Sequence, residues 1–216
     1  TLFLIYINDL HTSSEYFNFR IFADDTNLFH TFPARENDID MLQINRHLQD
    51  VVNWCNVNKL TINISKTNYI VLRGRHRSVN ILGEMKIANI VIKEVDGVSF
   101  VGLNIDKHLN WKMHIEKVNA NIRKKVGILY RLRNFVPMNV LVLLYKTLLQ
   151  PHLEYGIEAW GNAYESNLKC LYISQKMAVR AITFSSFLTP SKPLFQRLQI
   201  LKVQALCLLP HVQFSQ

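Results

Sequence analysis

The hydrophobic periodicity of the chain changes near Asn110, and this change limits the possible folds more than any other feature. Residues 81–105 are rich in Ile and Val and are interrupted by glycines, a pattern typical of two or three strands. In residues 112–133 the apolar side chains recur about every 3.6 positions, as on one face of a helix. We therefore predict an α+β fold, with a sheet-containing subdomain in residues 1–110 and a helical one in residues 111–216.

An aspartate pair interrupts an alternating segment of the first subdomain. Residues 17–21 alternate between apolar and polar side chains, and apolar residues resume at Leu28 and Phe29. This pattern predicts a β-hairpin with Asp24 and Asp25 at its tip. Adjacent carboxylates on a turn can contribute to a site for magnesium ions, but by itself an Asp-Asp pair is more simply two solvated turn acids.

The segment after the hairpin is predicted to contain a helix, two short strands and a basic loop. Apolar positions of residues 36–58 fall on one helical face, which predicts an amphipathic helix. Residues 60–64 and 69–72 are predicted to be strands on either side of a turn that contains Lys66. The basic loop that follows contains Arg73, Arg75 and Arg77.

The predicted helix in residues 112–133 has a strongly basic face. It holds seven Lys or Arg and one acid, and Lys117, Lys124 and Arg131, spaced by seven, lie opposite its apolar stripe. Such a stripe can follow a nucleic-acid backbone, although a solvated helix face is its simpler interpretation. Further helices are expected over residues 140–149, 167–183 and 191–208, with breaks at the prolines between them.

Composition favours a polyanion as partner and excludes several other classes. The formal net charge is +9, which promotes association with nucleic acid. Cys55, Cys170 and Cys207 match no zinc-site spacing and are expected to be reduced thiols. The apolar run of residues 2–7 is too short to span a membrane and lacks the features of a signal peptide. We expect an intracellular protein of the nucleus or cytoplasm that is not secreted.

Three tryptophans and two histidines are expected to be structural. Trp54, Trp111 and Trp160 stand in apolar contexts, so core packing is favoured over base stacking. His114 and His152 are likewise expected to have a structural role.

Several short motifs, in order along the chain, resemble the C-terminal palm and thumb portion of reverse transcriptases of non-LTR retrotransposons, the LINE-type and jockey-like elements. The resemblance extends from residue 1 to about residue 201. The motifs are LIYINDL (4–10) with FADDT (22–26), Trp54 with NKLTIN (58–63) and KT (66–67), FVGLNID (100–106), LNWKMHI (109–115), LQPHLEYG (149–156) with WG (160–161), and QKMAVR (175–180).

This resemblance implies roles for particular residues. Asp24 would be a direct ligand of two catalytic Mg²⁺ ions, and Asp25 would support the site. Lys66 would lie near the incoming deoxynucleotide, although it is also typical of an exposed turn lysine. Gly102 would belong to the primer grip, with a plain bulge glycine as the alternative. Lys117, Lys124 and Arg131 would follow the phosphates of an RNA template and DNA primer.

The implied fold is a partial polymerase palm, made of the hairpin, short antiparallel strands and a packed helix, followed by an α-helical thumb and a C-terminal helical region. The family completes its active site with an aspartate on an earlier strand, a glycine-rich template grip and the fingers. The chain starts at Thr1 within an apolar element and contains none of these parts. We therefore expect it to bind Mg²⁺ weakly or not at all, and to be inactive alone.

Three functions follow from these observations. The first is a fragment of an RNA-directed DNA polymerase that performs two-metal nucleotidyl transfer in the intact protein. The second is a non-catalytic nucleic-acid-binding remnant of a transposable element, in which the basic helix and the loop of Arg73, Arg75 and Arg77 bind RNA or DNA. The third is a basic helical scaffold with no nucleic-acid role.

Overall fold

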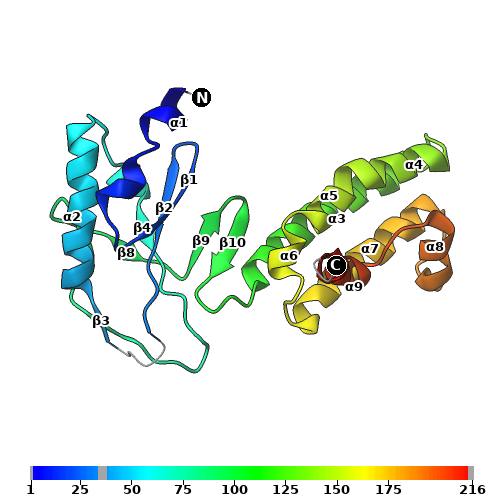
Figure 1. Cartoon of the computed structure of the whole chain (residues 1–216). Helices are drawn as coiled ribbons and strands as arrows, with labels where there is room; N and C mark the ends of the chain where they lie inside the picture. Colours follow the sequence, from blue (N-terminus) through cyan, green and yellow to red (C-terminus); the bar gives the residue numbers. More distant parts are fainter. Residues whose placement is uncertain (1, 34–37, 214–216) are drawn as a thin grey trace. The chain divides into compact units, whose positions relative to one another are not determined.

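The computed structural model describes residues 2–33 and 38–213, with side chains as far as residue 208. It divides the chain into two compact units, Thr1–Val101 and Gly102–Gln216. Figure 1 shows short strands and one long helix in the first unit and mainly helices in the second. The mixture of helices and short strands agrees with the predicted α+β class.

The first unit combines short helices and strands around one long helix, α2. Its elements are α1 (Leu2–Tyr6), η1 (Leu10–Ser13), β1 (Asn18–Phe22), β2 (Asp25–Phe29), β3 (Asp38–Asp40), α2 (Met41–Val57), η2 (Ile64–Lys66), β4 (Asn68–Tyr69), β5 (Asn80–Leu82), β6 (Lys86–Ile87), β7 (Ile90–Val91), β8 (Lys93–Glu94) and β9 (Gly97–Phe100). Among the described residues of this unit, the strands join in pairs: β1 with β2 and β6 with β7 are antiparallel, whereas β3 with β5 and β4 with β8 are parallel.

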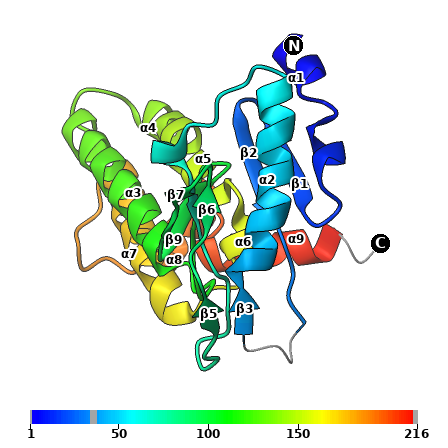
Figure 2. The same ribbon diagram turned by 90° about the vertical axis from the view of Figure 1, so that its left-hand side faces the viewer.

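Helix α2 supplies most of the core of the first unit. Its buried side chains recur at helical spacing, as the sequence predicts: Met41, Ile44, Leu48, Val51, Val52 and Cys55. Partly buried residues of the β1–β2 hairpin pack against the same core. In Figures 1 and 2 the helix runs alongside this hairpin.

The start of α2 differs from the predicted helix over residues 36–58. Residues 34–37 lie outside the described residues, and Asp38–Asp40 pair as strand β3. The helix begins at Met41 because the Asp40 carboxylate accepts a hydrogen bond from the Leu42 backbone amide at 2.8 Å, which caps the first turn.

The predicted strands after α2 are largely wrong. Of residues 60–64, none forms a strand, and the chain turns into the 3₁₀ helix Ile64–Lys66. Of residues 69–72, only Tyr69 belongs to a strand, β4. Apolar side chains in this segment pack against the α2 core without ladder pairing, so their hydrophobic pattern reflects packing rather than a sheet.

The second unit is mainly helical. Its elements are β10 (Leu103–Asp106), α3 (Lys112–Leu132), α4 (Met138–Leu144), the π-helical turn η3 (Tyr145–Leu149), α5 (Gln150–Glu154), α6 (Ile157–Trp160), α7 (Glu165–Ile182), α8 (Ser191–Leu198) and α9 (Val203–Gln213). Helices α3 and α7 lie side by side (Figure 1). Their apolar faces and the buried Trp160 belong to one core. None of the helices in the described ranges has the length and hydropathy needed to cross a bilayer.

Two helix breaks fall elsewhere than predicted. The chain stays helical through Pro151, which lacks an amide hydrogen, and the π-helical turn Tyr145–Leu149 lies directly before it. The predicted helix over residues 191–208 is interrupted instead, because Gln199 adopts a left-handed conformation (φ 52°) that ends α8.

Candidate functional site

The two aspartates lie at the tip of the β1–β2 hairpin. Phe22 pairs with Asp25, which leaves Ala23 and Asp24 as the two-residue turn. Ala23 has a φ of 54°, the left-handed backbone that a tight hairpin turn requires. Both carboxylates are exposed, and neither forms a hydrogen bond or ion pair with another described residue. The hairpin therefore forms as predicted and presents two adjacent charges to solvent.

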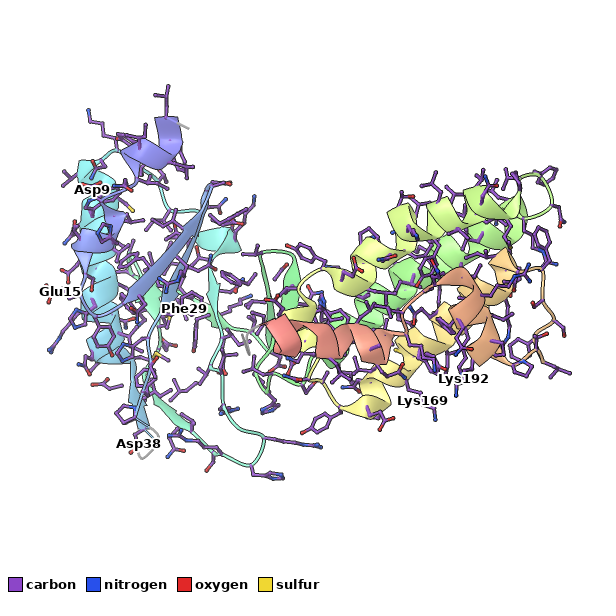
Figure 3. The ribbon with its side chains drawn as sticks, turned by 45° about the vertical axis from the view of Figure 1, so that its right-hand side comes forward. Asp9, Glu15, Phe29, Asp38, Lys169 and Lys192 are labelled. Atoms are coloured by element: carbon purple, nitrogen blue, oxygen red, sulfur yellow. The ribbon has the colours of Figure 1, made fainter. Side chains whose placement is uncertain are left out.

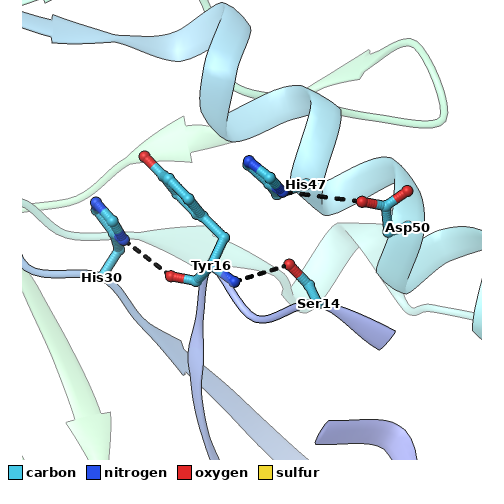
Figure 4. A network of polar contacts seen from close by, with 5 residues as sticks. All are labelled: Ser14, Tyr16, His30, His47 and Asp50. Atoms are coloured by element: carbon cyan, nitrogen blue, oxygen red, sulfur yellow. Dashed lines mark hydrogen bonds and ion pairs between the residues drawn. The ribbon is translucent and has the colours of Figure 1, made fainter. Parts of the chain in front are cut away.

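A stack of three rings holds the opposite end of the hairpin, as Figure 4 shows. Tyr16, just before β1, lies between His30, just after β2, and His47 of α2, with ring centroids 3.8 and 4.2 Å apart and planes within 7° of parallel. The His30 Nδ1 atom is 2.9 Å from the Tyr16 carbonyl oxygen, and the Tyr16 amide donates to Ser14 Oγ at 3.3 Å. His47 also pairs with Asp50 at 3.8 Å. We call Tyr16, His30 and His47 the ring stack.

An aromatic contact on β2 adds to this support. Phe29, labelled in Figure 3, meets Phe100 edge to face with ring centroids 5.9 Å apart. Together with the ring stack, it anchors the end of the hairpin away from the aspartates. The strands thus have fixed bases and an exposed tip.

The hairpin alone does not complete a metal site. Within the described ranges, no three His, Cys, Asp or Glu side chains gather so that they could hold an ion. Asp24 and Asp25 are two carboxylates on one strand pair, whereas a two-ion site takes clustered acids from more than one element. The residues present therefore do not fit the pair of Mg²⁺ ions that the resemblance implies.

The other predicted residues of the first unit are spread over separate segments. Lys66 is exposed at the end of η2, and in the described part of the chain its side chain has no hydrogen bond or ion pair. Arg75 is exposed, whereas Arg73 is half-buried. Arg77 is also half-buried and donates to the Pro33 carbonyl oxygen at 3.4 Å. Arg77 therefore holds the basic loop against Pro33 as well as adding positive charge.

The three basic residues of α3 are not equivalent. Lys117, Lys124 and Arg131 are all exposed, on the side of the helix away from buried Ile122. Lys117 alone donates to Asn104 Oδ1, at 3.3 Å, and it lines a pocket.

This pocket lies within the second unit and has a volume of about 330 Å³. Gly102 borders it with a φ of 77°, and a Cβ added there would lie 3.3 Å from the Tyr155 ring. Helices α3 and α5 contribute the remaining walls. The residues that carry its polar or aromatic groups are His114, Lys117, Asn121, His152 and Tyr155.

Burial lowers the pKa of both pocket histidines and so favours their neutral form. Burial, and then the charge of Lys117, lower the pKa of His114. Its Nδ1 atom accepts a hydrogen bond from the Asn104 amide at 3.3 Å, so the proton sits on Nε2, which is buried without a partner among the described residues. Burial, and then Lys125, lower the pKa of His152, whose Nε2 atom contacts the Lys125 amine. Burial also lowers the pKa of Lys125.

Sequence reasoning missed this pocket. Both histidines were expected to be structural; His114 is buried and His152 is half-buried, and both line the pocket. The four-residue turn of α3 that places His114 and Lys117 on one side is visible in the sequence. The approach of His152 and Tyr155 depends on how α5 packs against α3, which no local pattern reports.

Comparison with curated proteins finds three similar RNA-directed DNA polymerases from mobile elements of Drosophila melanogaster. The "Probable RNA-directed DNA polymerase from transposon X-element" is 24% identical over 153 residues, which cover 69% of this chain and 16% of that protein. The polymerase from mobile element jockey is 26% identical over 116 residues, 52% of this chain and 13% of that protein. The "Probable RNA-directed DNA polymerase from transposon BS" is 23% identical over 165 residues, 75% of this chain and 18% of that protein.

The chain thus spans less than a fifth of the length of each of these relatives. No family model and no solved structure matches it. The similarities support the resemblance to retrotransposon reverse transcriptases that the sequence motifs indicate, and they support a correspondence with only part of such an enzyme.

Proposed function

We propose that the chain is a fragment of a retrotransposon RNA-directed DNA polymerase. In the intact protein, the enzyme would extend a DNA primer with deoxynucleotides along an RNA template. The observation that carries the proposal is the β1–β2 hairpin, which presents Asp24 and Asp25 where the resemblance expects metal-binding aspartates. The similarity to three mobile-element polymerases supports the same conclusion.

In this proposal, residues 1–110 belong to the palm and residues 111–216 to the thumb and the helical region after it. Asp24 would bind metal in the intact enzyme, Asp25 would support it, and Lys66 would act near the incoming nucleotide. Gly102 would contact the primer strand. The basic face of α3, with Lys117, Lys124 and Arg131 exposed, would follow the phosphates of the template and primer.

A second function, binding of nucleic acid without chemistry, is favoured by the incomplete metal site. The hairpin supplies two acids, and no cluster of three potential ligands occurs in the described part of the chain. The exposed basic residues of α3, and the loop that carries Arg73, Arg75 and Arg77, remain able to bind a polyanion.

Binding of a fluorescein-labelled RNA–DNA hybrid to the 216-residue chain tests what the two functions share. We expect affinity to fall with salt, and neutralisation of Lys117, Lys124 and Arg131 to glutamine to reduce the log–log salt slope by roughly 0.9 per lost phosphate contact. Asp24→Asn should leave binding intact. Failure of the wild-type chain to bind the hybrid would overturn both functions and favour the scaffold.

Primer extension with Mg²⁺ then tests whether the chain by itself has a working polymerase site. We expect no extension by the wild-type chain, because two carboxylates hold two hard cations poorly. Extension that Asp24→Asn abolishes, and that the exposed control Asp9→Asn retains, would show a complete polymerase and contradict the proposed incompleteness. Asp9 is labelled in Figure 3, at the start of η1, and is a matched acid outside the hairpin.

A further inference from the structure

The pocket beside Gly102 has the size of a site for one small ligand. Its volume of about 330 Å³ lies at the lower end of the ~300–1,000 Å³ typical of small-molecule sites. All of its lining residues belong to the second unit. A double helix is far too large to enter such a pocket, whereas a single base or nucleotide is small enough.

The walls combine flat or apolar surfaces with a few polar groups. Tyr155 is 55% exposed, so its ring is accessible at the surface where it lines the pocket. Val118 and Pro151 add apolar surface, and His152 adds a second ring. A flat heteroaromatic ligand matches this combination, because rings stack on tyrosine and histidine while polar edges find hydrogen-bond partners.

Positive charge lies at the same pocket. Lys117 lines it, and its amine is held by a hydrogen bond to Asn104 Oδ1 at 3.3 Å. The Lys125 amine contacts the Nε2 atom of His152, one of the lining residues, although Lys125 itself does not line the pocket. The acids of the two pocket helices, Glu116 and Glu154, are exposed and are not among the lining residues. The ligand is therefore expected to be an anion as well as an aromatic ring.

From this geometry we infer that the pocket binds one unpaired nucleotide of a single-stranded nucleic acid, with the base against Tyr155 and the phosphate at Lys117. A paired base is shielded by stacking and base pairing, so only an unpaired one presents its face and edges. The inference rests on the proposed nucleic-acid function. It adds recognition of a base by His114, His152 and Tyr155, whereas the basic face of α3 would contact phosphates only.

Two matched pairs of variants of the 216-residue chain test the site. The probe is a fluorescein-labelled single-stranded oligothymidylate followed by anisotropy. We expect Tyr155→Ala to weaken binding about tenfold, the scale of one lost base stack. Lys117→Met should weaken it by about the same factor, because it removes the charge that contacts the phosphate. Tyr164→Ala, at a similarly exposed tyrosine, and Lys169→Met, at an exposed lysine of α7, should change affinity less than about twofold.

Competition identifies which part of the ligand is recognised. Thymidine 5′-monophosphate should displace the oligonucleotide at lower concentration than either thymidine or inorganic phosphate. Equal displacement by phosphate would reduce the pocket to an anion site and overturn the inference. Equal loss from Lys117→Met and Lys169→Met would overturn it too, by showing that any lost positive charge has the same effect, while leaving the proposed function standing. Failure of the wild-type chain to bind the oligothymidylate would overturn the inference, whereas the proposed function is judged separately by binding of the RNA–DNA hybrid.

Histidine side-chain NMR of the wild-type chain provides a readout that does not depend on variants. Thymidine 5′-monophosphate should shift the ring signals of His114 and His152 and leave those of exposed His76 in place. Unchanged signals at both pocket histidines under saturating nucleotide would contradict the site, whatever the variants do.

Discussion

The backbone amide of Asn104 donates a hydrogen bond to Nδ1 of His114 across 3.3 Å. This bond joins the strand β10 to the first turn of α3. It also selects the neutral ring with its proton on Nε2, because a protonated Nδ1 cannot accept. A second proton on this histidine would break the bond and place a charge in a side chain that is only 4% exposed.

We expect the chain to lose stability as the pH falls from about 7 to about 5. Burial, and then Lys117, lower the pKa of His114 in the folded chain, so the unfolded chain takes up a proton in this range that the folded chain resists. The lowered pKa of His152 acts in the same direction. The stabilisation is therefore complete above the ordinary histidine pKa and is lost below it.

Urea unfolding of the wild-type chain at about pH 7.5 and about pH 5.5 measures this loss. His114→Gln should shrink the difference between the two free energies of unfolding, whereas His76→Gln, at an exposed loop position, should preserve it. A difference of the same size in His114→Gln and the wild type would contradict the expectation.

Gly156 and Gly127 should respond to alanine in opposite directions. Gly156 has a φ of 63°, and a Cβ there would lie 2.7 Å from Leu103 Cδ2. Gly156→Ala should therefore destabilise the second unit by about 1–3 kcal/mol. Gly127 lies within α3, and a Cβ there meets nothing within 4 Å. Gly127→Ala should stabilise by about 0.5–1 kcal/mol, because alanine favours the helix. Chemical denaturation measures the free energy of unfolding of both variants. A gain in stability from Gly156→Ala would contradict the strain expected from a Cβ at position 156.

Gln175 should be sensitive to replacement by leucine. The side chain is fully buried in α7, and its Nε2 atom donates to the Tyr145 hydroxyl at 2.8 Å and to the Leu201 carbonyl at 2.9 Å. Its Oε1 atom accepts from the Val203 amide at 2.9 Å. Gln175→Leu leaves these groups unpaired and should cost about 2–4 kcal/mol.

The control for this change is Gln196→Leu, at an exposed position of α8, which should alter stability by less than about 0.5 kcal/mol. A second readout is the ionisation of Tyr145, followed by ultraviolet absorbance. Burial raises the pKa of Tyr145 to about 12, and the Gln175 hydrogen bond acts against this rise. The pKa should thus rise further in Gln175→Leu, and a fall would contradict the assigned hydrogen bond.

The helices and the hairpin were predictable from sequence because their signals are local. The apolar stripe of α3 and the buried face of α2 follow a single period over several turns. The hairpin follows from alternation on both sides of a turn-forming pair. The α+β class required no more than the change of period near Asn110.

The short strands and the helix breaks were less predictable. Residues 81–105 contain several strands of two to four residues, where two or three strands were expected, because each pairing is decided by a distant segment. Proline usually interrupts a helix, but here the π-helical turn before Pro151 lets the chain continue as a helix.

The candidate sites divide in the same way. The Asp24–Asp25 pair was visible because both residues lie at one turn. The pocket was not, since His114 lies far in sequence from His152 and Tyr155, and it meets them only through the packing of α5 on α3.

The ring stack fixes the β1–β2 hairpin at one end only. Tyr16, His30 and His47 clamp its base to α2, while Asp24 and Asp25 sit at the far end of two five-residue strands, roughly 15–17 Å away along the strands. The ring stack holds the base of the hairpin, whereas the exposed carboxylates at the tip form no hydrogen bond or ion pair with another described residue. A segment that packs against the tip would therefore fix the direction of the Asp24 and Asp25 carboxylates. Because His47 belongs to α2, the ring stack would couple a movement of the hairpin to that helix.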